Sequence, residues 1–129
     1  MFASYSTGAA TIALQVNVDN ITLGVDTAIP CGLIIHELVA NALKHAFPAG
    51  KQGEIRLDLR ASGDEWFMLR VSDNGIGFPK DVDFRRAKSL GLQLVNTLTE
   101  QLEGVIELQR HGGTTFIITF TELKYKKRG

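Results

Sequence analysis

Residues 54–77 read EIRLDLRASGDEWFMLRVSDNGIG, and they contain two stretches in which apolar and polar side chains alternate. Alternation with a period of two is typical of a strand with one buried face, and residues 61–64 have the composition of a tight turn. The stretch therefore predicts a β-hairpin. An acid, an amide and two glycines follow where the second strand ends, so this end of the hairpin is the first candidate for a functional site.

Asp73 is the most informative residue of that group. Counting by twos, Leu69, Val71 and Asp73 lie on one face of the strand. A carboxylate that faces an apolar layer is costly unless a group donates hydrogen bonds to it. The exocyclic amine of adenine is a suitable donor, whereas guanine has an acceptor there, so Asp73 would favour ATP over GTP. Gly75 and Gly77 let the backbone pass close to a ligand, although Asp-Asn-Gly is also a strong turn signal by itself.

On the N-terminal side, residues 30–46 have helical periodicity, with Asp26 and Thr27 as possible caps and a stop at Phe47-Pro48. The polar side chains of this helix share an arc of about 100°: Glu37, Asn41, Lys44 and His45. A carboxylate can orient water, an amide oxygen can bind Mg²⁺, and an ammonium can neutralise phosphate. These tasks suit a nucleoside triphosphate, and the alternative is an ordinary solvent-exposed face.

On the C-terminal side, residues 90–103 predict a second amphipathic helix, with Gly104 as its left-handed cap. Ser89-Leu90-Gly91-Leu92 is either a plain helix start or a phosphate cradle, because helix N-termini bind anions through free backbone N–H groups. Residues 105–109 and 114–120 predict a last hairpin. The hydroxyl of Thr115 could support a base beside Asp73, although an ordinary hairpin turn explains the threonines as well.

The remaining N-terminal segment completes the predicted order of elements. Residues 11–25, TIALQVNVDNITLGV, predict a hairpin with a turn at Asp19-Asn20, and residues 1–10 are expected to be a linker or a cloning remnant. The order β-β-α-β-β-loop-α-β-β predicts a two-layer α/β sandwich, in which a mixed, mostly antiparallel sheet is covered on one face by helices. We expect one domain over residues 11–123 and a basic tail over 124–129.

Composition indicates in which cellular compartment the protein works and which partners it lacks. The 129 residues carry 14 basic and 14 acidic side chains, so a general affinity for nucleic acid is not expected. Cys31 is the one cysteine, which excludes an internal disulfide and favours a reducing compartment. No apolar run approaches the roughly 20 residues that span a bilayer. We therefore expect a cytoplasmic domain without membrane contact.

Four segments together resemble a known family. HELVANALKHA (36–46), DNGIG (73–77), SLGL (89–92) and GGTTF (112–116) are similar to the N, G1, G2 and terminal glycine-threonine boxes of the histidine-kinase ATP-binding domain. This Bergerat fold is shared with heat-shock chaperones, type II topoisomerases and mismatch-repair ATPases, and the resemblance extends from about residue 11 to 121. The helical segments look most like sensor kinases whose dimerisation segment is of the second, non-standard kind.

The resemblance implies a domain that binds Mg-ATP and presents its γ-phosphate to a histidine on a separate dimerisation domain, with a downstream response regulator. It implies these roles: Glu37 in the catalytic water network, Asn41 as Mg²⁺ ligand, Lys44 and His45 near phosphates or sugar, Asp73 and Thr115 at the adenine, Gly75 and Gly77 around the adenine pocket, and Gly91 and Leu92 at the phosphates.

Two departures from the family pattern matter. The expected ATP lid, residues 78–90, is short and lacks the phenylalanine-rich box, and its basic residues Arg85, Arg86 and Lys88 either reach phosphates or form a solvated loop. The phosphoacceptor histidine is not matched by any segment, so this chain alone should not autophosphorylate. Two other functions fit the residues: a serine kinase of the anti-sigma type, and a nucleotide-binding or docking module without transfer activity.

Overall fold

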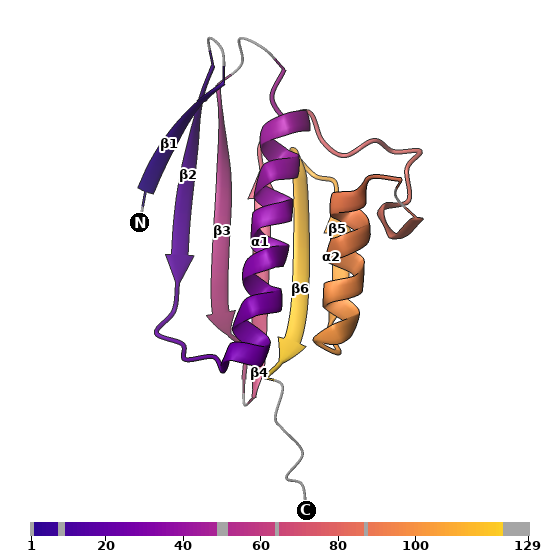
Figure 1. Cartoon of the computed structure of the whole chain (residues 1–129). Helices are drawn as coiled ribbons and strands as arrows, with labels where there is room; N and C mark the ends of the chain where they lie inside the picture. The colour runs from indigo at the N-terminus through magenta and orange to yellow at the C-terminus, as the bar shows by residue number, and fades with distance from the viewer. Residues whose placement is uncertain (1, 8–9, 49–51, 64, 87, 123–129) are drawn as a thin grey trace, which may run out of the picture.

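The computed structural model describes residues 2–7, 10–48, 52–63, 65–86 and 88–122, which form a sheet with two helices on one face (Figure 1). The elements in chain order are β1 (Phe2–Thr7), β2 (Ala10–Val18), α1 (Val25–His45), β3 (Gly53–Ala61), β4 (Trp66–Asp73), the 3-10 turn η1 (Phe84–Arg86), α2 (Leu90–Gln101), β5 (Val105–Gln109) and β6 (Thr114–Thr121). The strand order is β1-β2-β3-β4-β6-β5. Only β2 and β3 pair in parallel within this sheet, which confirms the predicted mixed, mostly antiparallel sandwich.

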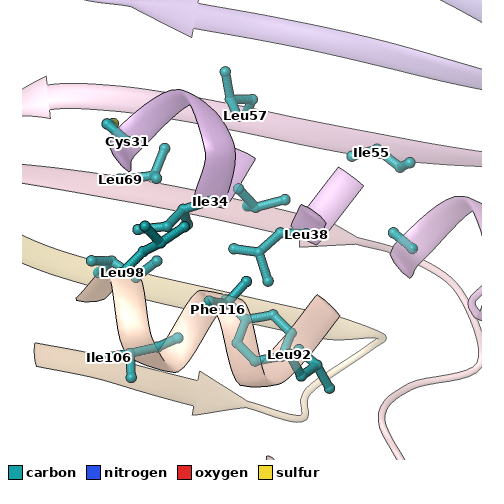
Figure 2. Packing of buried hydrophobic residues seen from close by; sticks show 14 of the residues in the cluster. Cys31, Ile34, Leu38, Ile55, Leu57, Leu69, Leu92, Leu98, Ile106 and Phe116 are labelled. Atoms are coloured by element: carbon teal, nitrogen blue, oxygen red, sulfur yellow. The ribbon is translucent and has the colours of Figure 1, made fainter. Parts of the chain in front are cut away.

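The helices cover the sheet unevenly. Figure 1 shows α1 over the middle strands and α2 toward the β5 edge, while no helix lies over β1 and β2. The parallel pairing of β2 with β3 requires a crossover, and α1 provides it. Ile34 and Leu38 of α1 and Leu98 of α2 point into the layer between helices and sheet, against residues such as Ile55 and Leu69 (Figure 2). This shared core fixes α1 relative to the end of β4.

The predicted hairpin over residues 11–25 is wrong. The segment contributes the single strand β2, whose hairpin partner is β1, so residues 2–7 belong to the sheet rather than to an unpaired linker. Asp19 ends β2 by joining it to β3: its N–H donates to the carbonyl of Leu59 at 2.9 Å, and its Oδ2 accepts from the N–H of Ala61 at 3.3 Å. The apolar residues that follow pack beside the core outside any strand, as Ile21 does.

Helix α1 begins five residues before the predicted start. Its N-cap is Gly24, whose carbonyl accepts from the N–H groups of Thr27 and Ala28, so neither Asp26 nor Thr27 caps it. The Gly24 N–H donates in turn to the Glu122 carboxylate beyond the end of β6. Pro30 consequently lies inside the helix rather than in its first turn.

Three further expectations concern Gly104, Cys31 and the C-terminal tail. The left-handed residue after α2 is Glu103, with a φ of 55°, and not Gly104. A glycine is needed at position 104 for a steric reason instead, because a Cβ there would lie 2.7 Å from the carbonyl oxygen of Thr119. Cys31 is buried as predicted, and burial raises its pKa to about 11. The predicted basic tail, residues 124–129, lies outside the described residues.

Neither helix in the described part of the chain is both long and apolar enough to cross a bilayer.

Candidate nucleotide site

A cavity of about 400 Å³ opens where α1, the end of β4, the start of α2 and the start of β6 meet. Its volume lies in the range of small-ligand sites, which are mostly apolar with a few convergent polar groups. The polar residues of the lining are Asn41, His45, Asp73, Lys88, Ser89 and Thr114. The apolar part of the lining includes Leu38, Val71, Phe78, Val82, Leu92 and Phe116. The arrangement suits a flat aromatic group with a polar extension.

Asp73 lines this cavity from the helix-facing side of β4, as predicted. Its Oδ1 accepts from the backbone N–H of Gly75 at 2.9 Å and from that of Thr114 at 3.3 Å. Burial raises the pKa of Asp73 above its ordinary value of 3.8, and these two hydrogen bonds lower it again in part. Both described hydrogen bonds end on Oδ1, so Oδ2 is the atom with which the carboxylate can accept from a ligand.

The glycines beside Asp73 bring three backbone segments together. Gly77 lines the cavity with a φ of +89°, in the region that favours glycine. Gly113 leaves room for β4, because a Cβ there would lie 2.0 Å from the carbonyl oxygen of Asp73. A Cβ at Gly75 would lie 2.2 Å from the carbonyl oxygen of Ala46. The DNGIG loop therefore rests directly on the end of α1, and this contact explains Gly75 without a ligand.

The part of the lining at the start of α2 is suited to phosphates. Lys88 supplies a cation there, and Ser89 is the N-cap of α2, its Oγ accepting from the N–H of Leu92 at 3.2 Å. The N-terminus of a twelve-residue helix and an ammonium group both stabilise anions. Asn41 and His45 face the cavity from α1. The predicted SLGL segment thus begins a helix at the cavity wall.

The structure separates the predicted site residues into two groups. Those that line the cavity are Asn41, His45, Asp73, Gly77 and Leu92; those that do not are Glu37, Lys44, Gly75, Gly91 and Thr115. Lys44 is exposed to solvent on α1. Glu37 is partly buried and faces the start of α2, since a Cβ at Gly91 would lie 2.7 Å from its Oε2. Gly91 therefore makes room for a carboxylate on α1.

The structure places Thr114, and not the predicted Thr115, at the cavity. Thr114 pairs with Asp73 in the β4–β6 register and lines the cavity, whereas Thr115 pairs with Ser72 and its side chain lies on the opposite face. Counting by twos back from the buried residues Ile118 and Phe116 leads to Thr114. That count was available from the sequence. Phe78, another missed wall residue, had no comparable periodic signal because it lies in a loop.

Comparisons with known proteins identify the family of the chain. Residues 27–124 match the family model described as histidine kinase-, DNA gyrase B-, and HSP90-like ATPase. The chain belongs to that ATPase family. Among relatives, this ATPase domain is 32% identical to the blue-light-activated histidine kinase 2 of Erythrobacter litoralis over 86% of the chain. It is 35% identical to the sensor histidine kinase PdtaS of Mycobacterium tuberculosis over 72% of the chain.

A solved structure agrees with the sequence comparisons. The blue-light activated histidine kinase EL346 of Erythrobacter litoralis superposes on 89% of this ATPase domain with a TM-score of 0.82 and 32% identity, using 36% of its own chain. The match to the serine-protein kinase RsbW of Listeria innocua has lower identity, 29%, and covers 55% of the chain. The chain spans 32% of the first curated relative and 19% of PdtaS, so it corresponds to one part of longer proteins.

Proposed function

We propose that this ATPase domain binds Mg-ATP in the cavity beside Asp73 and, within a full-length sensor kinase, presents the γ-phosphate to a histidine on a separate helical dimerisation domain. A response regulator would then receive the phosphate, and the domain would work in the cytoplasm. The observation that carries the proposal is the carboxylate of Asp73, because its Oδ1 is engaged by two backbone N–H groups and its Oδ2 remains for an adenine amine.

The residues of the cavity support a division of tasks. Asp73 and Thr114 lie at the base end, and the aromatic rings of Phe78 and Phe116 can enclose the base. Lys88 and the N-terminus of α2 would hold the phosphates and align the terminal one. Phosphoryl transfer depends mostly on such positioning and on charge neutralisation.

Asn41 fits the role of a Mg²⁺ ligand. Its amide oxygen can bind a hard cation without adding charge, and Asn41 faces the cavity. No three His, Cys, Asp or Glu side chains gather into a metal site among the described residues, so the ion would take its other ligands from phosphates and water. Bound Mg²⁺ would neutralise charge on the phosphates.

Glu37 is the proposed organiser of water at the attacking group. Its carboxylate lies beside the start of α2, next to the residues proposed to hold phosphate rather than inside the cavity. A carboxylate at this place can orient water or the incoming imidazole by accepting a hydrogen bond. Replacing Glu37 by Ala should therefore lower phosphotransfer with little change in ATP affinity.

Phosphotransfer from γ-labelled ATP tests the proposal. The full-length protein should acquire a label that acid removes, since phosphohistidine is acid-labile, and Glu37→Ala should abolish most of it. An acid-stable label would favour the serine kinase, the function that the RsbW match supports. Tight binding of Mg-ATP with no label transferred by either wild type or Glu37→Ala would favour a module that binds nucleotide without catalysing transfer.

A further inference from the structure

The segment between the DNGIG loop and α2 is anchored in the core by Phe84, which is buried and packs edge-on against Phe116. Between this lid and β5 lies a hollow of about 560 Å³, separate from the nucleotide cavity. Its lining is largely charged and includes Lys80, Asp83, Glu107 and Arg110. An open, polar hollow provides little apolar packing to the lid residues that precede Phe84, so their position depends on specific contacts at the edges of the hollow.

Side-chain hydrogen bonds supply those contacts. Arg110, just after β5, donates from Nη2 to the carbonyl of Val82 in the lid at 2.9 Å. Arg85 of η1 reaches in the opposite direction, from Nη2 to the carbonyl of Ile106 in β5 at 2.7 Å. Asn96 of α2 donates from Nδ2 to the carbonyl of Phe84 at 3.0 Å. The lid is thus attached to β5 and to α2.

Arg110 differs from Arg85 because both of its contacts are to walls of the nucleotide cavity. Besides the bond to Val82, its guanidinium lies 5.6 Å from the centre of the Phe78 ring, within the range of a cation–π contact. Phe78 packs edge-on against Phe116, with ring centroids 6.0 Å apart. Val82, Phe78 and Phe116 line the cavity, whereas Arg110 does not.

We propose that Arg110 is a positioning residue that holds the lid wall of the adenine pocket, and that it does so without touching the nucleotide. The inference rests on the proposed function, because it assigns a task to the same cavity. Without Arg110, the Val82 carbonyl and the Phe78 ring lose a common contact. Nucleotide binding must then also order the lid, which lowers the affinity.

Calorimetry with Mg-ATP, Mg-ADP and adenosine on wild type, Arg110→Ala and Arg110→Lys tests the proposal. Arg110→Ala should weaken all three ligands by a similar factor, roughly 3- to 10-fold, the equivalent of one hydrogen bond. The three ligands share the adenosine group, and the lid wall would contact that group in each of them. Arg110→Lys should recover much of the affinity, because an ammonium can also donate to Val82 and lie over Phe78.

Arg70→Ala is the matched control, since Arg70 is exposed on β4, on the sheet face away from the helices. Hydrogen exchange gives an independent readout without nucleotide: the amides of Val82 and Arg86, which bond to Pro79 and Asp83 within the lid, should exchange faster in Arg110→Ala only. The melting temperature should stay near that of wild type.

Several results would overturn this role for Arg110. Unchanged affinities and unchanged lid exchange would remove it from the lid. A loss confined to Mg-ATP would make Arg110 a direct phosphate contact, and a large fall in melting temperature would make it a residue of general stability. Failure of the wild type to bind any adenine ligand would instead reject the proposed function itself.

Discussion

Asp73 has two oxygens with different tasks. Oδ1 joins the DNGIG loop to the start of β6 through the N–H groups of Gly75 and Thr114, and Oδ2 can accept from a base. The face of Asp73 was predictable from the two-residue period of its strand, but its backbone partners were not. One partner comes from 41 residues away, and no local pattern specifies that approach.

Asp73→Asn should shift the nucleotide preference from ATP toward GTP. If the amide oxygen keeps the bonds to Gly75 and Thr114, the Nδ2 donor replaces Oδ2 and opposes the adenine amine, which is also a donor. ATP affinity should fall roughly 10- to 100-fold, as expected for an unpaired buried polar group, and GTP should bind better than before. Calorimetry measures both, with Asp26→Asn, an exposed site in the first turn of α1, as control. Equal ATP affinity of wild type and Asp73→Asn would remove Asp73 from the site.

The pH dependence follows from the raised pKa of Asp73. Burial favours the protonated form in the folded protein, so this group contributes stability below its ordinary pKa of 3.8, and that contribution is lost as pH rises through the folded pKa. Lowering pH through this window should raise the unfolding free energy of wild type relative to Asp73→Asn while weakening its ATP binding. Denaturant titrations and calorimetry at matched pH values test this pair of opposite trends. ATP affinity that stayed constant would contradict the acceptor role.

Elements differ in how far sequence patterns specified them. The hairpin of β3 and β4 and both helices were predicted because each has a clear period of 2 or 3.6. Residues 11–25 were misassigned because short apolar runs fit a strand, a loop beside the core or a helix start equally well. Packing decided among these: Asp19 bonds to the end of β3, and Gly24 bonds to Glu122.

Two glycine substitutions should act in opposite directions on these elements. Gly32 lies exposed inside α1, and a Cβ added there would have no neighbouring atom within 4 Å, so Gly32→Ala should stabilise the protein by about 0.5–1 kcal/mol through helix propensity. Gly104→Ala should destabilise it by about 1–3 kcal/mol, because its Cβ would meet the carbonyl of Thr119. Urea unfolding measures both. A stabilised Gly104→Ala would show that the α2–β5 connection can move away from β6.

The whole domain should respond to nucleotide as one cooperative unit. A ligand that binds only the folded state at 100 times its dissociation constant stabilises it by about 2.7 kcal/mol. Mg-ATP should therefore raise the melting temperature, and GTP should do so less. The emission of Trp66, on the far side of the sheet from the cavity, reports global unfolding. An unchanged melting temperature at saturating Mg-ATP would argue against the nucleotide site.

The isolated domain should bind ATP without becoming labelled. Its three histidines have no motif of a phosphoacceptor, and the chain spans only 32% of the Erythrobacter litoralis kinase and 19% of PdtaS. Incubation with γ-labelled ATP should label the full-length protein and not the domain alone, with equal amounts of folded domain in both reactions. Acid-labile label on the isolated domain would show that a histidine within these 129 residues accepts phosphate.

The sequence alone determined the periodic elements, the face on which Asp73 lies and the four motifs that mark the ATPase family, because all of these depend on residues near one another in the chain. The tertiary structure decided that β1 pairs with β2, that Thr114 rather than Thr115 joins Asp73, that Glu37 faces Gly91 and that Arg110 bonds to the carbonyl of Val82. These features depend on strand register and on packing between distant segments. The contacts that stabilise these features form only when the whole sheet and both helices are in place.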